Sequence, residues 1–285
     1  MFYLLIVSLL WAFSFGLIKE NLTGLDSNFV SFARLLISFL VFAPFLKIKN
    51  IPKDVVIKFT ITGLVQFGLM YISYIYSFQF LKAYEVALFT IFTPIYVTLI
   101  NDVLHKKFHK LFLITALLSV VGTAIIKYSE ISGNVLNGFL FVQISNLSFA
   151  FGQTYYKRLK EKTPNLKDSN IFGYLLLGGG LLAGFFSIFS TDWHSLSVSA
   201  DQIWTLIYLG VVASGIGFFL WNYGATKTDA GALAIFNNLK IPLAIVVSII
   251  FFGEETNFVR LIAGGIIIIA ALFLNEYYKS RIDKE

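Results

Sequence analysis

Lys240 lies inside an apolar stretch, 231–252, about nine residues from its start. In an α-helix this position is roughly 13 Å along the axis, at about 1.5 Å per residue. A cation that deep in a membrane costs several kcal/mol unless it is paired or faces water. Pro242 deprives the carbonyl of Asn238 of its helical hydrogen bond, so we predict an unwound, polar point where the ammonium binds a substrate carboxylate. A structural lysine, paired with a carbonyl or carboxylate of a neighbouring helix, is the alternative.

Other polar and aromatic residues in apolar stretches could complete a substrate site. Asn and Thr supply hydrogen-bond donors and acceptors, and aromatic rings are typical walls of small-molecule sites. Asn146 and Gln153 are seven residues apart and therefore share one helix face. Thr hydroxyls bonded to their own helix, hydrogen bonds between helices and ordinary core packing are the alternatives. The predicted substrate-binding residues are Lys240, Asn237, Asn238, Thr90, Thr93, Asn146, Gln153, Trp11, Tyr71 and Tyr74.

A second group of residues could open, close or drive such a site. Pro94 and Pro242 are two of only five prolines, and each falls within an apolar run. Glu85 stands at the edge of another run, where it could take up a proton or form part of a gate, or simply face interfacial water. We predict Glu85, Pro94 and Pro242 as gating or coupling residues.

Four further residues in apolar runs favour structural roles. Arg34 is near the end of its run, where we expect it to pair with a backbone or loop acidic group. Ser14 and Ser214 stand beside glycines and are expected at close helix contacts. Trp221, near the end of its run, is expected in the belt of aromatic residues at a membrane surface.

The composition requires a membrane as the surroundings of these residues. Hydrophobic residues make up 57% of the 285, charged residues only 13%, and the mean hydropathy is +0.78. Soluble domains carry about 25% charged residues. A span needs roughly 20 apolar residues, and the fold class we predict is all-α, a polytopic membrane protein with ten transmembrane helices. The ten spans lie near 2–18, 28–46, 58–80, 86–104, 111–126, 137–156, 171–190, 203–223, 231–252 and 258–277.

The positions of the basic residues give the expected orientation. With ten spans, 16 of the 22 Lys and Arg residues fall in loops on one side of the membrane and four on the other. Basic loops stay in the cytoplasm, so both termini are predicted to be cytoplasmic and the protein is expected in a bacterial inner membrane. The same distribution argues against nucleic acid as the partner of this basic chain.

The two halves of the sequence resemble each other. Gly63, Gly68, Tyr76, Ala83, Ala87 and Phe89 align without a gap with Gly210, Gly215, Tyr223, Ala230, Ala234 and Phe236, and one further residue of shift brings Pro94 onto Pro242. We therefore predict two repeats, 1–130 and 131–285. Each holds an odd number of spans, so the two repeats must be inverted relative to each other, which is a common transporter design.

Particular segments resemble a known family. They are 10–16 (LWAFSFG), Arg34, 89–94 (FTIFTP), 213–217 (ASGIG) and 252–254 (FGE), and together they span the chain. In these segments the chain resembles the drug/metabolite transporter superfamily, of the EamA-domain type. Runs 88–100 and 210–238 are also similar to the biotin uptake carriers within it. One departure is Lys106, which stands where the family pattern leads us to expect a glutamate.

The resemblance implies solute transport without identifying the solute. Biotin import by a secondary carrier, with the biotin carboxylate near Lys240, is the function that we predict. Export or import of amino acids or other small metabolites is the alternative. An intramembrane enzyme is disfavoured because the three histidines fall in predicted loops and the chain has no cysteine and no H-E-x-x-H pattern. We expect no cofactor and no metal, the lipid bilayer and a small carboxylate as partners, and we predict no oligomeric state.

Overall fold

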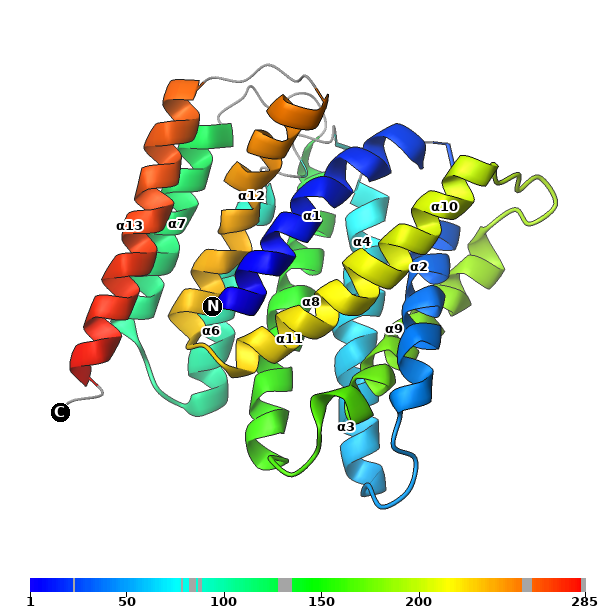
Figure 1. Cartoon of the computed structure of the whole chain (residues 1–285), viewed down its shortest axis with the longest axis horizontal. Helices are drawn as coiled ribbons and strands as arrows, with labels where there is room; N and C mark the ends of the chain where they lie inside the picture. The colour runs from blue at the N-terminus through cyan, green and yellow to red at the C-terminus, as the bar shows by residue number, and fades with distance from the viewer. Residues whose placement is uncertain are drawn as a thin grey trace.

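The chain folds into a bundle of helices, with no strand among the residues that the structure describes (Figure 1). The computed structural model describes all residues except 23, 78, 82–85, 87, 88, 128–134, 253–257 and 283–285. Its helices are α1 (Phe2–Asn21), α2 (Ser27–Phe42), η1 (Ala43–Phe45), α3 (Lys53–Gly63), η2 (Leu64–Leu69), α4 (Met70–Ser77), η3 (Thr90–Phe92), α6 (Thr93–His105), α7 (Lys110–Lys127), α8 (Val135–Lys162), α9 (Asp168–Ser190), α10 (Ala200–Tyr208), η4 (Leu209–Ile216), α11 (Gly217–Thr226), α12 (Ala230–Phe252) and α13 (Phe258–Ile282).

The long apolar helices make this a multi-pass membrane protein. Six helical segments among the described residues are long and apolar enough to cross a bilayer, and two shorter apolar helices lie at Phe2–Ser14 and Lys110–Gly122. Within the described residues, each of the ten predicted spans overlaps a helix or a run of consecutive helices. The number of crossings, ten, stays a prediction.

Two of the helical runs contain a π-helical segment. Between α3 and α4 it is η2, and between α10 and α11 it is η4. In the register that places Gly63 on Gly210, residues 64–69 of η2 correspond to 211–216 of η4. The two π segments therefore align in the predicted repeat, although the sequence has no evident pattern that indicates them. Such π segments are frequent at functional sites.

The two prolines that the predicted repeat aligns differ in their effect on the helices. Pro94 lies in the first turn of α6, where a proline is tolerated because its N–H would have no helical partner. Pro242 lies inside α12, which continues as a helix from Ala230 to Phe252. The predicted unwound point at Pro242 is therefore wrong, since surrounding helices let a membrane helix keep a proline without breaking.

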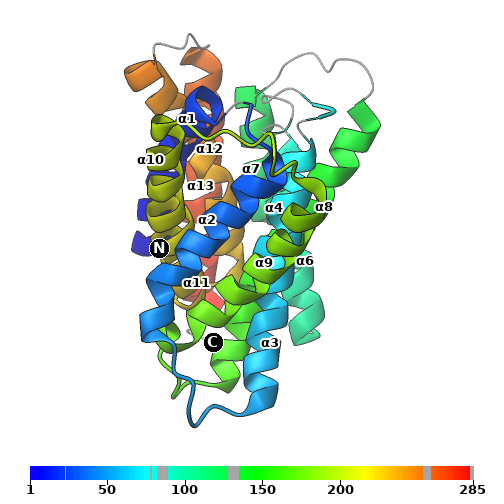
Figure 2. The same ribbon diagram turned by 90° about the vertical axis from the view of Figure 1, so that its right-hand side faces the viewer.

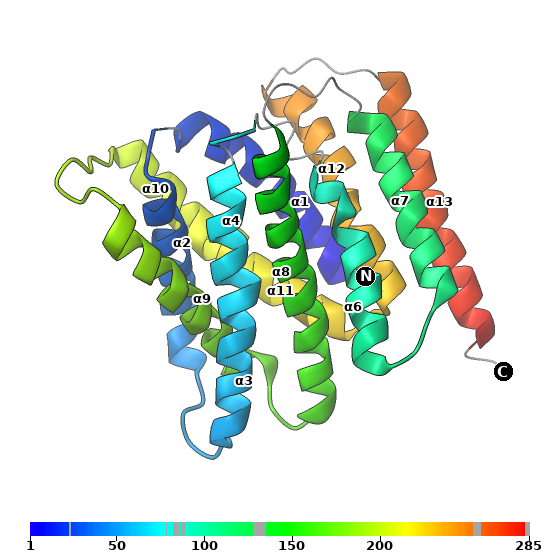
Figure 3. The same cartoon turned by 180° about the vertical axis from the view of Figure 1, so that it is seen from behind.

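Helices that the predicted repeat makes equivalent pack on each other. α2 lies against α9, α6 against α12, and α7 against α13, and the contact of α1 with α12 has its counterpart in that of α8 with α6. Figure 2 shows α2 crossing beside α9, and Figure 3 shows α7 and α13 together at one edge of the bundle. This pairing brings residues from both halves to the middle of the molecule.

Glycines make the closest helix contacts possible. A Cβ atom at Gly63 would lie 1.9 Å from the carbonyl oxygen of Leu175, and one at Gly178 would lie 1.9 Å from that of Thr60. Because no side chain fits at either distance, α9 packs backbone to backbone on α3 and η2.

Candidate functional site

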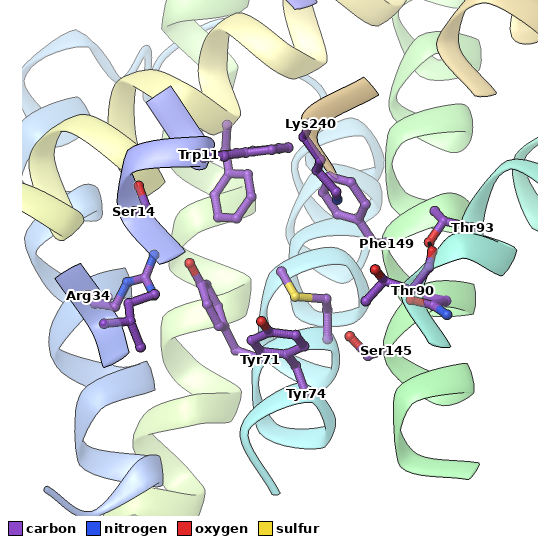
Figure 4. A pocket seen from close by; sticks show the side chains of 14 residues that line it. Trp11, Ser14, Arg34, Tyr71, Tyr74, Thr90, Thr93, Ser145, Phe149 and Lys240 are labelled. Carbon is purple, nitrogen blue, oxygen red and sulfur yellow. Dashed lines mark hydrogen bonds between the residues drawn. The ribbon is translucent and has the colours of Figure 1, made fainter. Parts of the chain in front are cut away.

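A cavity of about 120 Å³ lies between helices of both halves (Figure 4). Its walls come from α1, α2, α4, η3, α6, α8, α11 and α12. Seven of the ten predicted substrate-binding residues line it: Trp11, Tyr71, Tyr74, Thr90, Thr93, Asn146 and Lys240. Although these residues are dispersed over 230 positions of the sequence, the fold brings them around one space.

Lys240 extends from α12 into this cavity, where aromatic rings surround its ammonium (Figure 4). Its Nζ atom lies 5.4 Å from the centre of the Trp11 ring and 5.8 Å from that of Phe149. Both distances are within the range of cation–π attraction. No described residue gives the ammonium an ion pair or a hydrogen bond, so the rings hold the charge without neutralising it.

Trp11 is fixed in place from two sides. Its indole N–H donates to the carbonyl oxygen of Ala213 in η4 at 2.9 Å, and its ring centre is 4.9 Å from that of Trp221. Trp221 has no exposed surface and donates to Oε1 of Gln153 at 2.8 Å. The expected interfacial position of Trp221 is therefore wrong, because this side chain is part of the core beneath Trp11.

Arg34 also lines the cavity, on the side formed by α2. Its Nε and Nη2 donate to the hydroxyl oxygen of Ser214 at 3.2 and 3.0 Å, and its guanidinium carbon lies 4.8 Å from the centre of the Tyr71 ring. The Tyr71 hydroxyl is 3.0 Å from the same Ser214 oxygen. The expected pairing with a backbone or loop acidic group is wrong, because a neutral hydroxyl and a ring face hold the guanidinium.

The cavity therefore has two positive charges and no described acidic residue in its walls. Arg34 and Lys240 are the charged members, and the other lining residues are neutral. Removing a cation from water at membrane depth costs about 2.5–3.5 kcal/mol even by the lower scales. Two desolvated cations at one cavity favour a binding site for an anion. No carboxylate of the described lining pairs with them, and a bound anion would supply the missing electrostatic attraction.

Three predicted residues lie behind the cavity wall instead of in it. Gln153, Asn237 and Asn238 are at most 1% exposed. Asn237 donates to Oε1 of Gln153 at 3.2 Å, and Asn238 donates to the carbonyl oxygen of Ile91 at 3.2 Å. In this conformation they join helices together, which is the interhelical alternative.

Gln153 and Asn237 belong to a buried layer made of two hydrogen-bonded groups, Gln153 with Trp221 and Asn237, and Gln66 with Asn222. We call it the amide layer and define it as Gln66, Gln153, Trp221, Asn222 and Asn237. Gln66 and Asn222 exchange two hydrogen bonds, of 2.7 and 3.1 Å, and neither has exposed surface. Each member is three or four residues from a lining residue, toward the end of the bundle where the basic loops lie (the lower end of Figure 1). The amide layer therefore lies between the cavity and that end of the bundle.

The structure describes two of the three predicted gating or coupling residues. Pro94 and Pro242 are buried and do not line the cavity. Glu85 lies outside the described residues. No group of three or more potential His, Cys, Asp or Glu metal ligands occurs among the described residues.

Several lining residues were not among the predicted binding residues. They are Ser14, Ile18, Arg34, Met70, Ser145, Phe149 and Phe218. Phe149 is three residues after Asn146 and four before Gln153, so helical periodicity places it on their face and could have identified it. Ser14 was expected at a close helix contact, and its hydroxyl does bond within its own helix, to Leu10 at 2.9 Å.

Comparison with known proteins decides the family. The model of the EamA-like transporter family matches residues 1–128 and again 136–276. The chain belongs to the EamA-like transporter family. As a member it is a transporter, and the family resemblance seen in its motifs is confirmed.

Relatives within this EamA-like family include proteins named for biotin. A "probable biotin transporter" of Pseudomonas aeruginosa is 40% identical over 96% of both chains. A "biotin transporter" of Escherichia coli K12 is 37% identical over 95% of this chain and 91% of its own, and that of Salmonella typhimurium is 38% identical over the same shares. One crystal structure matches with a TM-score of 0.80 at 14% identity, over 96% of this chain and 95% of the other, and supports the fold alone.

Proposed function

We propose that this EamA-family transporter imports biotin, as a secondary carrier, across a bacterial inner membrane. The observation that carries the proposal is the cavity with two cations, aromatic walls and no acidic residue among its described members. Biotin has one carboxylate, an apolar chain and bicyclic ring, and a polar ureido group. Relatives named as biotin transporters, alike over nearly their whole length, support the same substrate.

The carboxylate of biotin binds near Lys240 in this proposal. A lysine ammonium is a compact point charge with three donors, and here the Trp11 and Phe149 rings leave those donors available. The apolar part of biotin would lie against Trp11, Phe149 and Phe218, which all line the cavity.

Amino acids, the alternative substrates, fit these walls less well. Their carboxylate would find Lys240, but their ammonium would face two cations and find no carboxylate in the described lining. Like charges at close range in a site of low dielectric repel strongly. A singly charged carboxylate is therefore favoured over a zwitterion.

Transport would proceed by alternating access of two inverted five-helix repeats with ten spans and cytoplasmic termini. Three features support this arrangement: the family model matches each half, the π segments recur in register, and equivalent helices pack on each other. Inverted-repeat carriers rock their bundles around a central site. A cavity of about 120 Å³ is smaller than the roughly 300–1,000 Å³ of ordinary ligand sites, so the helices must separate to admit biotin.

The test is labelled biotin uptake in a bacterial host without its own biotin carrier. We expect growth on trace biotin and uptake that unlabelled biotin, but not amino acids, inhibits. The variant Lys240→Ala should bind biotin roughly 10- to 150-fold more weakly, the value of one hydrogen bond to a charged group. Lys227→Ala is the matched control, because Lys227 packs on Tyr223 outside the cavity.

Two results would contradict different parts of the proposal. Absence of rescue despite good membrane expression, or competition by amino acids, argues against biotin as the substrate. Normal uptake by Lys240→Ala leaves biotin as the substrate and rejects Lys240 as the carboxylate ligand.

A further inference from the structure

We propose that Arg34 is the second polar anchor of the site and binds the neutral hydrogen-bond acceptor at the end of the substrate opposite its carboxylate. With biotin this acceptor is the ureido carbonyl oxygen. The inference rests on the proposed function and extends it, because it assigns one end of the substrate to each of the two cations.

The guanidinium of Arg34 has donors left over after its contacts within the protein. It carries five N–H groups in a planar fork, and Nε and Nη2 both donate to the single hydroxyl oxygen of Ser214. The third nitrogen, Nη1, has no hydrogen-bond partner among the described residues, and yet it is not one of the fully buried polar atoms without a partner. It is therefore exposed, and because Arg34 lines the cavity, its N–H groups are open to that space.

A purely structural role does not account for this charge. Arg34 is 6% exposed, and its hydrogen-bond partner is the neutral hydroxyl of Ser214. A structural arginine in a membrane helix is expected to pair with a carboxylate or with backbone carbonyls. The Tyr71 ring and Ser214 orient the guanidinium without neutralising it, which is what a ligand-binding arginine requires.

The surroundings of the two cations suit different chemical groups. Around Lys240 lie the Trp11 and Phe149 rings, whereas the Arg34 side of the cavity carries the hydroxyl groups of Ser14, Tyr71 and Tyr74 (Figure 4). A ureido group both accepts at its carbonyl oxygen and donates at its two N–H groups. Arg34 supplies donors and the hydroxyl oxygens supply acceptors, so this side can satisfy both kinds of group at once.

The π segment η4 holds both sides of the site from two consecutive residues. The carbonyl of Ala213 fixes Trp11 beside Lys240, and the hydroxyl of Ser214 fixes Arg34. One short segment therefore holds a side chain at each of the two anchors. A substrate that reaches both must have its carboxylate and its acceptor at a matching distance.

Comparing biotin with each of two analogues can show which end of the substrate Lys240 binds and which end Arg34 binds. Biotinol, in which an alcohol replaces the carboxylic acid, reports on recognition of the carboxylate when compared with biotin. In 2-iminobiotin a cationic guanidinium replaces the neutral ureido group, because such groups stay protonated up to a pH of about 12, so it reports on recognition of the acceptor. The measurement is competition of each ligand with labelled biotin on the purified full-length protein in detergent.

We expect the wild-type protein to prefer biotin in both pairs. Arg34→Gln should lower the ratio of the affinities for biotin and 2-iminobiotin roughly 10- to 100-fold, because it loses a charged hydrogen bond to biotin and a like-charge repulsion with 2-iminobiotin. The ratio of the affinities for biotin and biotinol should stay unchanged. Lys240→Gln should give the reverse pattern. Ser214→Ala, which keeps the arginine but removes its support, should weaken only the discrimination against 2-iminobiotin and serves if Arg34→Gln does not fold.

The outcomes separate the inference from the proposed function. If Arg34→Gln loses the preference over biotinol instead, the two ends are reversed and the inference is wrong. If neither Arg34→Gln nor Ser214→Ala changes either ratio, Arg34 does not contact the substrate. A wild-type protein that binds no biotin would overturn the proposed function itself, and the inference with it.

Discussion

The amide layer lies between the cavity and the basic loops, and we expect it to block access from that side. One substitution can weaken it. Asn222→Leu removes both hydrogen bonds of the buried Gln66–Asn222 pair, at 2.7 and 3.1 Å. Each is worth about 1 kcal/mol, so the closed layer loses about 2 kcal/mol. The open layer loses little, because water replaces the lost partner there. At about 1.4 kcal/mol per tenfold change, the equilibrium between closed and open layer should shift roughly 30-fold toward open.

The absence of cysteine from the chain makes this shift measurable. In a Ser14→Cys background, the thiol on the cavity wall is the only target for a membrane-impermeant maleimide. Added from the side of the basic loops, in inside-out vesicles, the reagent reaches Ser14→Cys only through an open layer. The labelling rate should then rise roughly 30-fold in Asn222→Leu, because the rate follows the population of the open form while that form is rare.

An exchange of the two amides provides the control. The double variant Gln66→Asn with Asn222→Gln keeps two facing amides and should label at the rate of the Ser14→Cys parent. Equal rates in Asn222→Leu and the parent, with both proteins folded, would show that the Gln66–Asn222 pair does not close the cavity and that the barrier lies elsewhere.

Two further predictions concern folding. Gly178→Val should prevent folding, because its Cβ would lie 1.9 Å from the Thr60 carbonyl oxygen. Gly180→Val should fold, because nothing lies within 4 Å of its Cβ. The elution profile in detergent distinguishes the two variants, and a folded Gly178→Val would disprove the packing argument. Trp221→Phe should lower the free energy of unfolding by about 1 kcal/mol, since Oε1 of buried Gln153 loses one of its two donors, at 2.8 Å, and keeps the other, Asn237. Unchanged thermal unfolding of that variant would show that this hydrogen bond contributes nothing.

The positions of the helices could be predicted from the sequence because the bilayer imposes a simple rule. Apolar runs of about 20 residues, bounded by charges and prolines, must be helices to satisfy their backbone, and each predicted range coincides with helix. Lys240 could be placed at the cavity for the same reason, since an uncompensated charge in such a run has few other places to point.

The contacts between distant segments could not be predicted in the same way. Arg34 and Ser214 are 180 residues apart, and the π segment that presents Ser214 has no evident pattern in the sequence. Gln153 and Asn237 lie on the helix faces that line the cavity but one turn beyond it, a shift comparable to the uncertainty of about 2–4 residues in helix ends inferred from sequence. Periodicity gives the face of a helix, whereas depth along it depends on how partner helices slide against it.

The π segment η4 connects the surroundings of the two uncompensated charges. A π turn leaves backbone groups outside the regular helical pattern, and the carbonyl of Ala213 uses this freedom to accept the Trp11 indole. The next residue, Ser214, turns its hydroxyl to Arg34. Because η4 also packs on α2, where Ser38 donates to the Gly210 carbonyl at 2.7 Å, a shift of η4 would move Trp11 and Arg34 together. A change at one end of a bound substrate would thus reach the other end through two hydrogen-bonded contacts, Trp11–Ala213 and Ser214–Arg34. This is a physical route by which substrate could favour one conformation of the carrier.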